Sequence, residues 1–166
     1  MDNLMKNKKG VIMGVANERS IAWGIAKKLY QHGAKLIFTY QTENLKKRII
    51  PLTNSIGCEE IYQCDVYDNK DHEHSIENVF LKIKKKSPNI DFVVHALAFS
   101  DKDELKGRYI ETSRDNFLKT LDISTFSFTR TAKASSELMT KKGGNLLTLS
   151  YIGANRTTPN YNVMGV

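Results

Sequence analysis

The sequence has 166 residues and 40% of them are hydrophobic, which is enough for one domain with a buried core and excludes a disordered chain. The formal net charge is +7, but the lysines are spread over several segments without interleaved aromatic residues, so nucleic-acid binding is not predicted. No apolar run approaches the roughly 18 residues that span a membrane, the first residues lack a secretory signal, and two cysteines do not make a disulfide framework, so we predict a cytoplasmic protein without membrane insertion.

The predicted elements alternate between short apolar strands and longer amphipathic helices. In chain order, strands are predicted at residues 9–14, 35–40, 60–64, 91–96 and 145–150, and helices at 20–31, 43–55, 71–86 and 113–139. A loop at 97–112, a turn at 142–144 and the first turns of another helix at 159–166 complete the pattern, and Pro51 is expected to disturb the end of its helix. This order predicts an α/β fold with a doubly wound parallel sheet of the Rossmann type, with about five strands and with all of residues 1–166 in one dinucleotide-binding domain.

The loop between the first strand and the first helix is a candidate phosphate site. In such a fold the pyrophosphate of a dinucleotide lies against backbone N–H groups and the helix N-terminus. Gly14 and Ala16 allow close approach, and Ser20 is predicted to cap the helix and to offer its hydroxyl to phosphate. The G-x-G-x-x-G spacing is absent, so a simple turn is the alternative interpretation of this loop taken alone.

Polar residues follow the next two strands. Gln41 can hydrogen-bond a ribose hydroxyl without neutralising a phosphate, which favours NADH over NADPH, although nearby basic residues leave NADPH open. Asp65 would accept a hydrogen bond from an adenine amino group, and a turn or helix-capping role explains it equally well.

The histidines do not indicate a metal site. Small residues around His95 suggest a ligand close to the end of the fourth strand, but we expect His95 itself to be buried and hydrogen-bonded. His32, His72 and His74 are predicted on helix surfaces, and the last two do not share a helix face.

Two tyrosines near the end of the sequence are candidates for chemistry. Tyr151 follows the fifth strand and Tyr161 lies on the segment predicted to begin a helix, so the two can converge on one pocket. A phenol can donate a hydrogen bond to an oxygen that gains charge in a transition state. On spacing alone, structural tyrosines are the default interpretation.

Taken together, these segments resemble enoyl-acyl-carrier-protein reductase of the short-chain dehydrogenase superfamily. The matching stretches are residues 14–17, 20–22, 38–41, 63–66, 149–154 and 159–165. An ordinary carbonyl reductase of that superfamily has Y-x-x-x-K, whereas here Tyr161 is followed four residues later by Gly165.

The resemblance implies NADH-dependent reduction of a trans-2-enoyl thioester on acyl carrier protein in fatty-acid biosynthesis, with hydride transferred to the β-carbon. Tyr161 would hydrogen-bond the thioester oxygen, Tyr151 would line the acyl pocket, and Ser100 would contact substrate. Lys102 and Lys106 are guesses for residues that steer the acidic carrier protein, and the family implies a homotetramer. The positions matching cofactor contacts are Gly14, Ser20, Ile21, Gln41, Asp65, Val66, Leu97 and Met164.

The sequence departs from the family pattern because the family has a lysine seven positions after Tyr161 and this sequence ends at Val166. We therefore expect a C-terminally truncated fold whose fifth strand is an exposed edge. A non-catalytic nucleotide-binding fragment and another short-chain carbonyl reductase are the alternatives.

This departure predicts that the chain alone is weakly active or inactive, since a positioning charge of this kind contributes roughly 2.7–4 kcal/mol. NADH oxidation with a crotonyl thioester measures the turnover. A rate close to that of a full-length family member would contradict the expectation.

Overall fold

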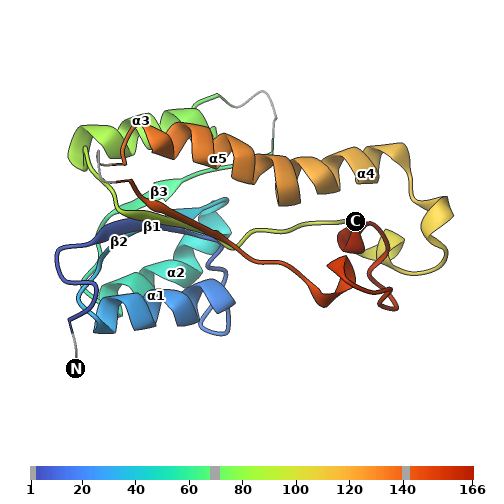
Figure 1. Ribbon diagram of the computed structural model, residues 1–166, viewed down its shortest axis with the longest axis horizontal. Helices are drawn as coiled ribbons and strands as arrows, with labels where there is room; N and C mark the ends of the chain where they lie inside the picture. Colours follow the sequence, from blue (N-terminus) through green and yellow to red (C-terminus); the bar gives the residue numbers. More distant parts are fainter. Residues whose placement is uncertain (1–2, 68–71, 140–142) are drawn as a thin grey trace.

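Five parallel strands form one sheet in the computed structural model, which describes residues 3–67, 72–139 and 143–166 (Figure 1). The strand order is β3-β2-β1-β4-β5, so the chain builds outward from β1 in one direction and then in the other. Every neighbouring pair is parallel, which confirms the predicted doubly wound sheet. The strands are β1 Lys9–Met13, β2 Lys35–Tyr40, β3 Ile61–Gln63, β4 Phe92–His95 and β5 Asn145–Thr148.

Helices cover both faces of the sheet. In Figure 1, α1 (Ile21–Gln31) and α2 (Glu43–Ser55) lie on one face, and α3 (Ile76–Lys86) and α5 (Ser127–Ser136) lie on the other. The α4 helix (Arg114–Leu121) extends from α5 beyond the sheet. Within the described ranges, no helix is long and apolar enough to cross a bilayer.

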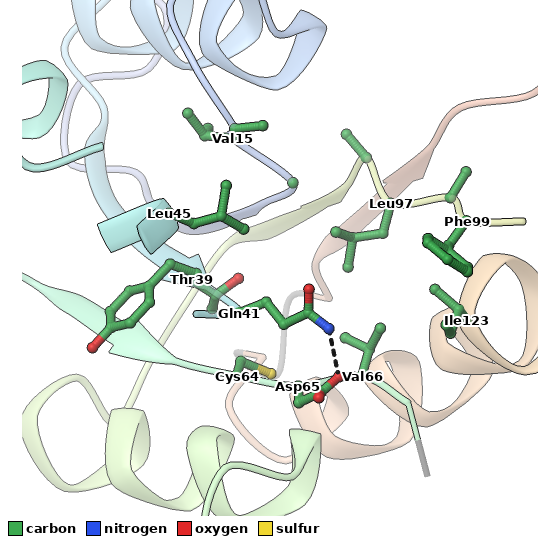
Figure 2. Close-up of a pocket in the computed structure, with 15 residues that line it drawn as sticks. Val15, Thr39, Gln41, Leu45, Cys64, Asp65, Val66, Leu97, Phe99 and Ile123 are labelled. Atoms are coloured by element: carbon green, nitrogen blue, oxygen red, sulfur yellow. Dashed lines mark hydrogen bonds between the residues drawn. The ribbon is translucent and has the colours of Figure 1, made fainter. Parts of the chain in front are cut away.

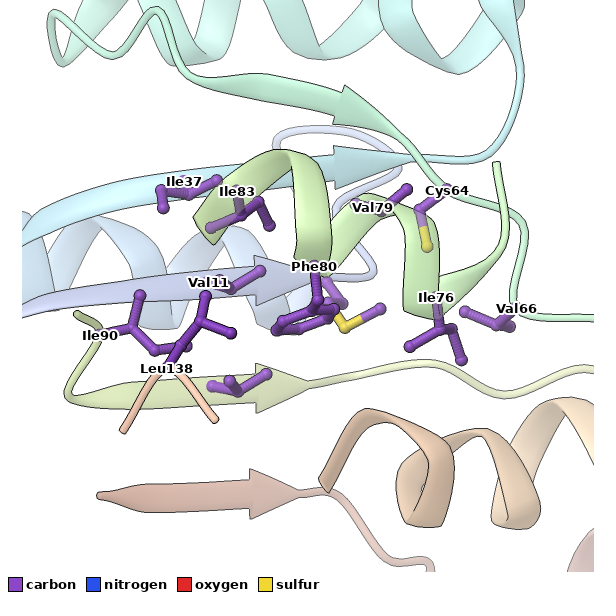
Figure 3. Close-up of a cluster of buried hydrophobic side chains, with 12 residues drawn as sticks. Val11, Ile37, Cys64, Val66, Ile76, Val79, Phe80, Ile83, Ile90 and Leu138 are labelled. Carbon is purple, nitrogen blue, oxygen red and sulfur yellow. The ribbon is translucent and has the colours of Figure 1, made fainter. Parts of the chain in front are cut away.

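The two faces of β1 belong to two different cores, because successive side chains of a strand point to opposite sides. Val11 packs with α3 residues such as Phe80 in the first cluster, which Figure 3 shows. Ile12 packs in the second cluster with Trp23 of α1, whose ring lies 6.1 Å from that of Phe38. All five side chains are at most 4% exposed, so the sheet is sealed on both sides.

The third helix begins later than predicted. The sequence pattern indicated residues 71–86, but α3 begins at Ile76 because the Ser75 hydroxyl accepts a hydrogen bond from Asn78 N (3.4 Å) and caps the helix there. His72 and His74 therefore precede the helix, and their predicted place on its surface is wrong. Residue 71 lies outside the described residues.

The single helix predicted at 113–139 is also divided. It begins with Ser113 as its cap, passes through a π-helical turn at Asp122–Phe126 and ends as α5 at Ser136. The Ser127 hydroxyl donates to the Ile123 carbonyl oxygen over 2.6 Å, which replaces regular helix pairing at the turn. Residue 142 of the predicted 142–144 turn lies outside the described ranges.

Three further details differ from the sequence-based expectation. Pro51 lies inside α2, which continues for another turn to Ser55. The loop at 97–112 contains two 3₁₀ turns, η1 (Lys102–Leu105) and η2 (Tyr109–Glu111). The segment at 159–166 forms only a 3₁₀ turn, η5 (Asn162–Gly165), so Tyr161 precedes a turn and does not lie on a helix.

The amino-terminal ends of the strands are joined by charged groups. Asp91 accepts hydrogen bonds from Lys8 Nζ (2.8 Å) and from the backbone N–H of Lys9 (2.9 Å). Burial alone would raise the pKa of Asp91, but these bonds lower it below its ordinary value. The Lys9 ammonium also bonds Glu60 and the Ser87 hydroxyl, so β1 is connected to the segments that precede β3 and β4.

The fifth strand forms one edge of the sheet, as predicted. Its only strand partner among the described residues is β4, in a register that begins with Phe92 opposite Asn145. Leu147 is 42% exposed and Leu149, just after the strand, is 38% exposed. The edge therefore presents apolar side chains as well as unpaired backbone groups.

The packing of α3 gives a matched pair of mutations. Phe80 is 1% exposed and its neighbour Leu81 is 52% exposed. We expect Phe80→Ala to lower the free energy of unfolding by about 3–5 kcal/mol, because it removes apolar contacts and leaves a cavity. Leu81→Ala should change it by about 0.5 kcal/mol or less. Urea unfolding followed by circular dichroism measures both, and equal effects would contradict this account of the core.

Candidate functional site

A pocket of about 230 Å³ lies at the carboxyl ends of the strands, and we call it the strand-end pocket (Figure 2). It opens where the strand order reverses, between the loop after β1 and the loop after β4, which is where ligands bind in doubly wound sheets. Its lining residues are Gly14, Val15, Ala16, Thr39, Tyr40, Gln41, Leu45, Cys64, Asp65, Val66, Ala96, Leu97, Ala98, Phe99 and Ile123.

The strand-end pocket brings together five of the residues predicted to bind a cofactor. They come from four loops that are separate in the sequence, and they are Gly14, Gln41, Asp65, Val66 and Leu97. Ser20, at the end of the first loop, and Ile21, the first residue of α1, lie outside the lining, and Met164 lines a second pocket.

Gly14 allows the loops after β1 and β4 to touch. Its φ is +100°, and a Cβ atom built there would lie 2.0 Å from the carbonyl oxygen of Ala96. Any side chain would therefore be strained and would push the two loops apart. The pocket depends on this contact, because Gly14 and Ala96 are both in its wall.

Ser20 shapes the first loop by a contact that differs from the predicted one. It has the backbone conformation of a helix cap, but its hydroxyl makes no cap hydrogen bond to α1, so the predicted side-chain cap is wrong. The hydroxyl oxygen instead accepts from the N–H groups of Ala16 and Asn17, each at 3.0 Å. Ile21, the first residue of the helix, is 66% exposed.

A hydrogen-bonded corner closes the pocket at β2 and β3. The amide nitrogen of Gln41 donates to Asp65 Oδ1 over 3.2 Å, which Figure 2 shows as a dashed line. The same carboxylate oxygen accepts from Tyr67 N (3.1 Å), and the side chain of Gln63 donates to the backbone carbonyl oxygen of Gln41 (3.2 Å). These bonds fix both side chains that would face a ribose or an adenine ring.

Arg130, on α5, supports the part of the pocket rim that contains Val66. Its guanidinium binds both oxygens of Glu77, at 3.0 and 2.8 Å, and also donates to the carbonyl oxygen of Val66 (3.3 Å). The hydrogen bond from Arg130 lowers the pKa of Glu77, so this carboxylate stays charged to more acidic pH. Nothing in the sequence around Arg130 marks this role, because its partners are far away along the chain.

Cys64 lies in the floor of the pocket as a neutral thiol. The residue is 5% exposed, and burial raises the pKa of Cys64 to about 12. A thiolate is the reactive form of cysteine, so this group contributes an apolar surface and not a nucleophile.

The π-helical turn supplies the opposite wall. Ile123 lines the pocket, and the Ser124 hydroxyl accepts from Phe99 N (3.0 Å) and donates to Phe99 O (3.1 Å). These two hydrogen bonds attach the loop after β4 to the π-helical turn. Sequence periodicity missed both residues, because a π-helical turn and a regular helix give the same apolar pattern here.

His95 supports the same turn from inside the protein. It is fully buried, and its Nε2 lies 2.7 Å from the hydroxyl of Ser127, which donates its own hydrogen to Ile123 O. The Nε2 atom is therefore the protonated one. Burial lowers the pKa of His95, so the imidazole is neutral, as expected for a structural histidine.

A second pocket of about 140 Å³ contains Tyr151 and Met164, and we call it the tyrosine pocket. Leu97 and Ala98 line both pockets, so the two spaces are neighbours. Tyr161 does not line this pocket, but its ring centre is 5.7 Å from that of Tyr151 in an edge-to-face arrangement. Burial raises the pKa of Tyr151, and the nearby Tyr161 raises it further, so this phenol remains a hydrogen-bond donor.

Ser100, predicted to contact substrate, faces a different neighbour. Its hydroxyl lies 3.2–3.3 Å from the side-chain amide of Asn116, which is 1% exposed. Ser100 lines neither pocket, so its contact with a substrate stays a prediction. Among the residues that the structure describes, no group of three or more His, Cys, Asp or Glu side chains is arranged to hold a metal ion.

The Ser124 contacts predict a local effect. Ser124→Ala removes both hydrogen bonds to Phe99, so we expect exchange of the Phe99 amide proton to become about 2- to 10-fold faster, the effect of one modest hydrogen bond. Ser136→Ala is the control, because the Ser136 hydroxyl bonds only within its own helix, to Lys133 O. NMR hydrogen exchange measures both variants, and unchanged exchange in Ser124→Ala would show that the bonds do not hold the loop.

Known proteins share this sequence and this fold. Residues 14–166 match the family model described as enoyl-(acyl carrier protein) reductase. The chain is 54% identical, over 98% of its length, to enoyl-[acyl-carrier-protein] reductase [NADH] 1 of Rhizobium meliloti. The crystal structure of the enoyl-(acyl-carrier-protein) reductase from Anaplasma phagocytophilum in complex with NAD matches 99% of the chain, with a TM-score of 0.92 and 50% identity.

A third relative carries a different cofactor. The Bacillus cereus enoyl-acyl carrier protein reductase, solved with NADP⁺ and indole naphthyridinone, matches 99% of the chain with a TM-score of 0.91 and 44% identity. The chain spans 58% of the Rhizobium protein, 62% of the Anaplasma chain and 63% of the Bacillus chain. These matches run through every loop of the strand-end pocket, and on their strength the chain belongs to the enoyl-(acyl carrier protein) reductase family.

Proposed function

We propose that this protein takes part in fatty-acid biosynthesis by reducing trans-2-enoyl-acyl-carrier-protein to acyl-acyl-carrier-protein with NADH. The observation that carries the proposal is the contact between the two pockets through Leu97 and Ala98. A cofactor in one pocket and an acyl thioester in the other would meet at this wall. The relatives named for this reaction support it, and none of the three matched proteins is named as a carbonyl reductase.

The strand-end pocket fits a dinucleotide in position and in chemistry. It lies at the carboxyl edge of a doubly wound sheet, where Gly14 keeps the backbone bare beside the opening. Gln41 and Asp65 provide a polar corner for ribose and adenine, while Val15 and Leu97 provide apolar walls. Bound NADH would supply a hydride for the β-carbon of the enoyl thioester.

The two tyrosines suit the other half of the reaction. Negative charge develops on the thioester oxygen during reduction, and a phenol hydrogen bond stabilises it. We assign this hydrogen bond to Tyr161 and a place in the wall of the acyl pocket to Tyr151. The edge-to-face contact between their rings supports a shared role for the two residues, and the raised pKa of Tyr151 supports a protonated phenol there at neutral pH. Met164 lines the same pocket on the turn after Tyr161.

The carrier protein would approach over the loop that contains Lys102 and Lys106. Asn162 donates from its side chain to the carbonyl oxygens of Glu104 (2.9 Å) and Lys106 (3.1 Å), so this loop is tied to the turn after Tyr161. Lysines on it would meet an acidic partner at the mouth of the tyrosine pocket. A homotetramer in the cytoplasm remains part of the proposal, and the free thiols of Cys58 and Cys64 suit a reducing compartment.

A substitution of Tyr161 tests the assignment. Tyr161→Phe keeps the ring contact with Tyr151 and removes the donor, so we expect the rate of enoyl reduction to fall by about 100-fold. The dissociation constant of NADH should stay within about twofold, because the hydroxyl is assigned to the thioester oxygen. Single-turnover measurements with excess protein and crotonyl-acyl-carrier-protein record slow rates as well as fast ones.

Tyr109→Phe is the matched control, because Tyr109 is 46% exposed on η2 and has no assigned role. Where the wild type gives a measurable rate, a Tyr161→Phe variant that is equally fast would remove Tyr161 from the mechanism. Faster reduction of a simple ketone than of the enoyl thioester would contradict the proposed reaction itself.

A further inference from the structure

We infer that Asp65 sets the preference for NADH over NADPH by fixing which end of the Gln41 amide faces the ribose. The inference rests on the proposed function, because it concerns the cofactor of that reaction. It treats Asp65 as a positioning residue that acts through its neighbour, in addition to any contact that it makes with adenine.

The chemistry of the pair allows only one orientation of the amide. An ionised carboxylate accepts hydrogen bonds and cannot donate, so the group of Gln41 that lies 3.2 Å from Asp65 Oδ1 is the NH₂. The side-chain oxygen of Gln41 must then point away from Asp65. Figure 2 shows it turned toward the open centre of the pocket, between Leu45 and Leu97.

A carbonyl oxygen in that position discriminates between the two cofactors. It accepts a hydrogen bond from the 2′-hydroxyl of the NADH ribose. It can offer nothing to the 2′-phosphate of NADPH, which is also only an acceptor near neutral pH, and the Asp65 carboxylate adds a repelling charge of the same sign. An amide turned the other way would present its NH₂ and could bind the phosphate.

Lys46 is one of the basic residues after β2, and its charge is engaged by other groups. The Lys46 ammonium bonds Glu43 Oε1 (3.2 Å) and lies 5.5 Å from the centre of the Tyr40 ring. The ammonium is therefore held by Glu43 and Tyr40, where β2 leads into α2.

The backbone alone does not exclude a phosphate. The Bacillus cereus reductase, whose chain superposes with a TM-score of 0.91, was solved with NADP⁺. A fold of this shape therefore accepts the 2′-phosphate, and the choice between cofactors depends on side chains at this corner.

The test is a double-mutant cycle read as the ratio of two dissociation constants, NADPH over NADH, measured by calorimetry on the chain. Asp65→Ala removes the oxygen that accepts from the Gln41 NH₂, so residue 65 no longer dictates the orientation of the amide; the loss of the Tyr67 N contact is common to both backgrounds of the cycle. We expect this variant to lower the ratio by about 10-fold, the value of one hydrogen bond to a charged group. In a Gln41→Ala background the same change should alter the ratio by about threefold or less.

Glu59→Gln is the control, because it also removes one carboxylate but lies outside the lining of the strand-end pocket, and it should leave the ratio within about twofold. Weaker binding of both cofactors in Asp65→Ala at an unchanged ratio would limit Asp65 to adenine binding and overturn the inference. An equal drop with and without Gln41 would also overturn it, since charge alone would then explain the effect. Failure of the wild type to bind NADH at all would instead refute the proposed function.

Discussion

The position of β1 in the middle of the sheet is the constraint on which the rest of the structure depends. Its backbone pairs with β2 on one side and β4 on the other, both in parallel register, from Gly10 opposite Leu36 and Phe92. The chain leaves β1 and β4 toward opposite faces of the sheet, so the two loops diverge after their contact at Gly14 and Ala96. The strand-end pocket is the space that this divergence leaves, and its shape follows from backbone topology.

Side chains then fix the walls that topology leaves loose. The Ser124 hydroxyl attaches the loop after β4 to the π-helical turn, and Arg130 attaches the segment after β3 to α3 through Glu77. Under the same turn, the neutral His95 and Ser127 form a buried hydrogen-bonded pair. Each of these contacts links elements that are distant in the sequence, so the pocket is rigid only when the whole sheet with its helices is formed.

Much of this fold follows from the sequence, because apolar runs and helical periods are local properties. The strands, the parallel sheet and the pocket residues Gly14, Gln41 and Asp65 were predictable in this way. The hydroxyl contacts were not, because a serine such as Ser20 can bond several backbone groups and the sequence does not choose among them. The π-helical turn was missed as well, because a regular helix has the same apolar pattern, and the contact of Ser127 with His95 joins distant parts of the sequence.

A cluster of polar and charged residues lies at the amino-terminal edge of the sheet, at the opposite ends of the strands from both pockets. Its members are Lys8, Lys9, Glu60, Ser87 and Asp91. The charged contacts and the strand-end pocket, where we propose that the cofactor binds, therefore lie in separate parts of the molecule. Substitutions at the amino-terminal edge can therefore change stability against heat or acid without changing the residues that line the pockets. For protein engineering, mutations at the amino-terminal edge and mutations in the pockets should have independent effects, the first on stability and the second on ligand binding.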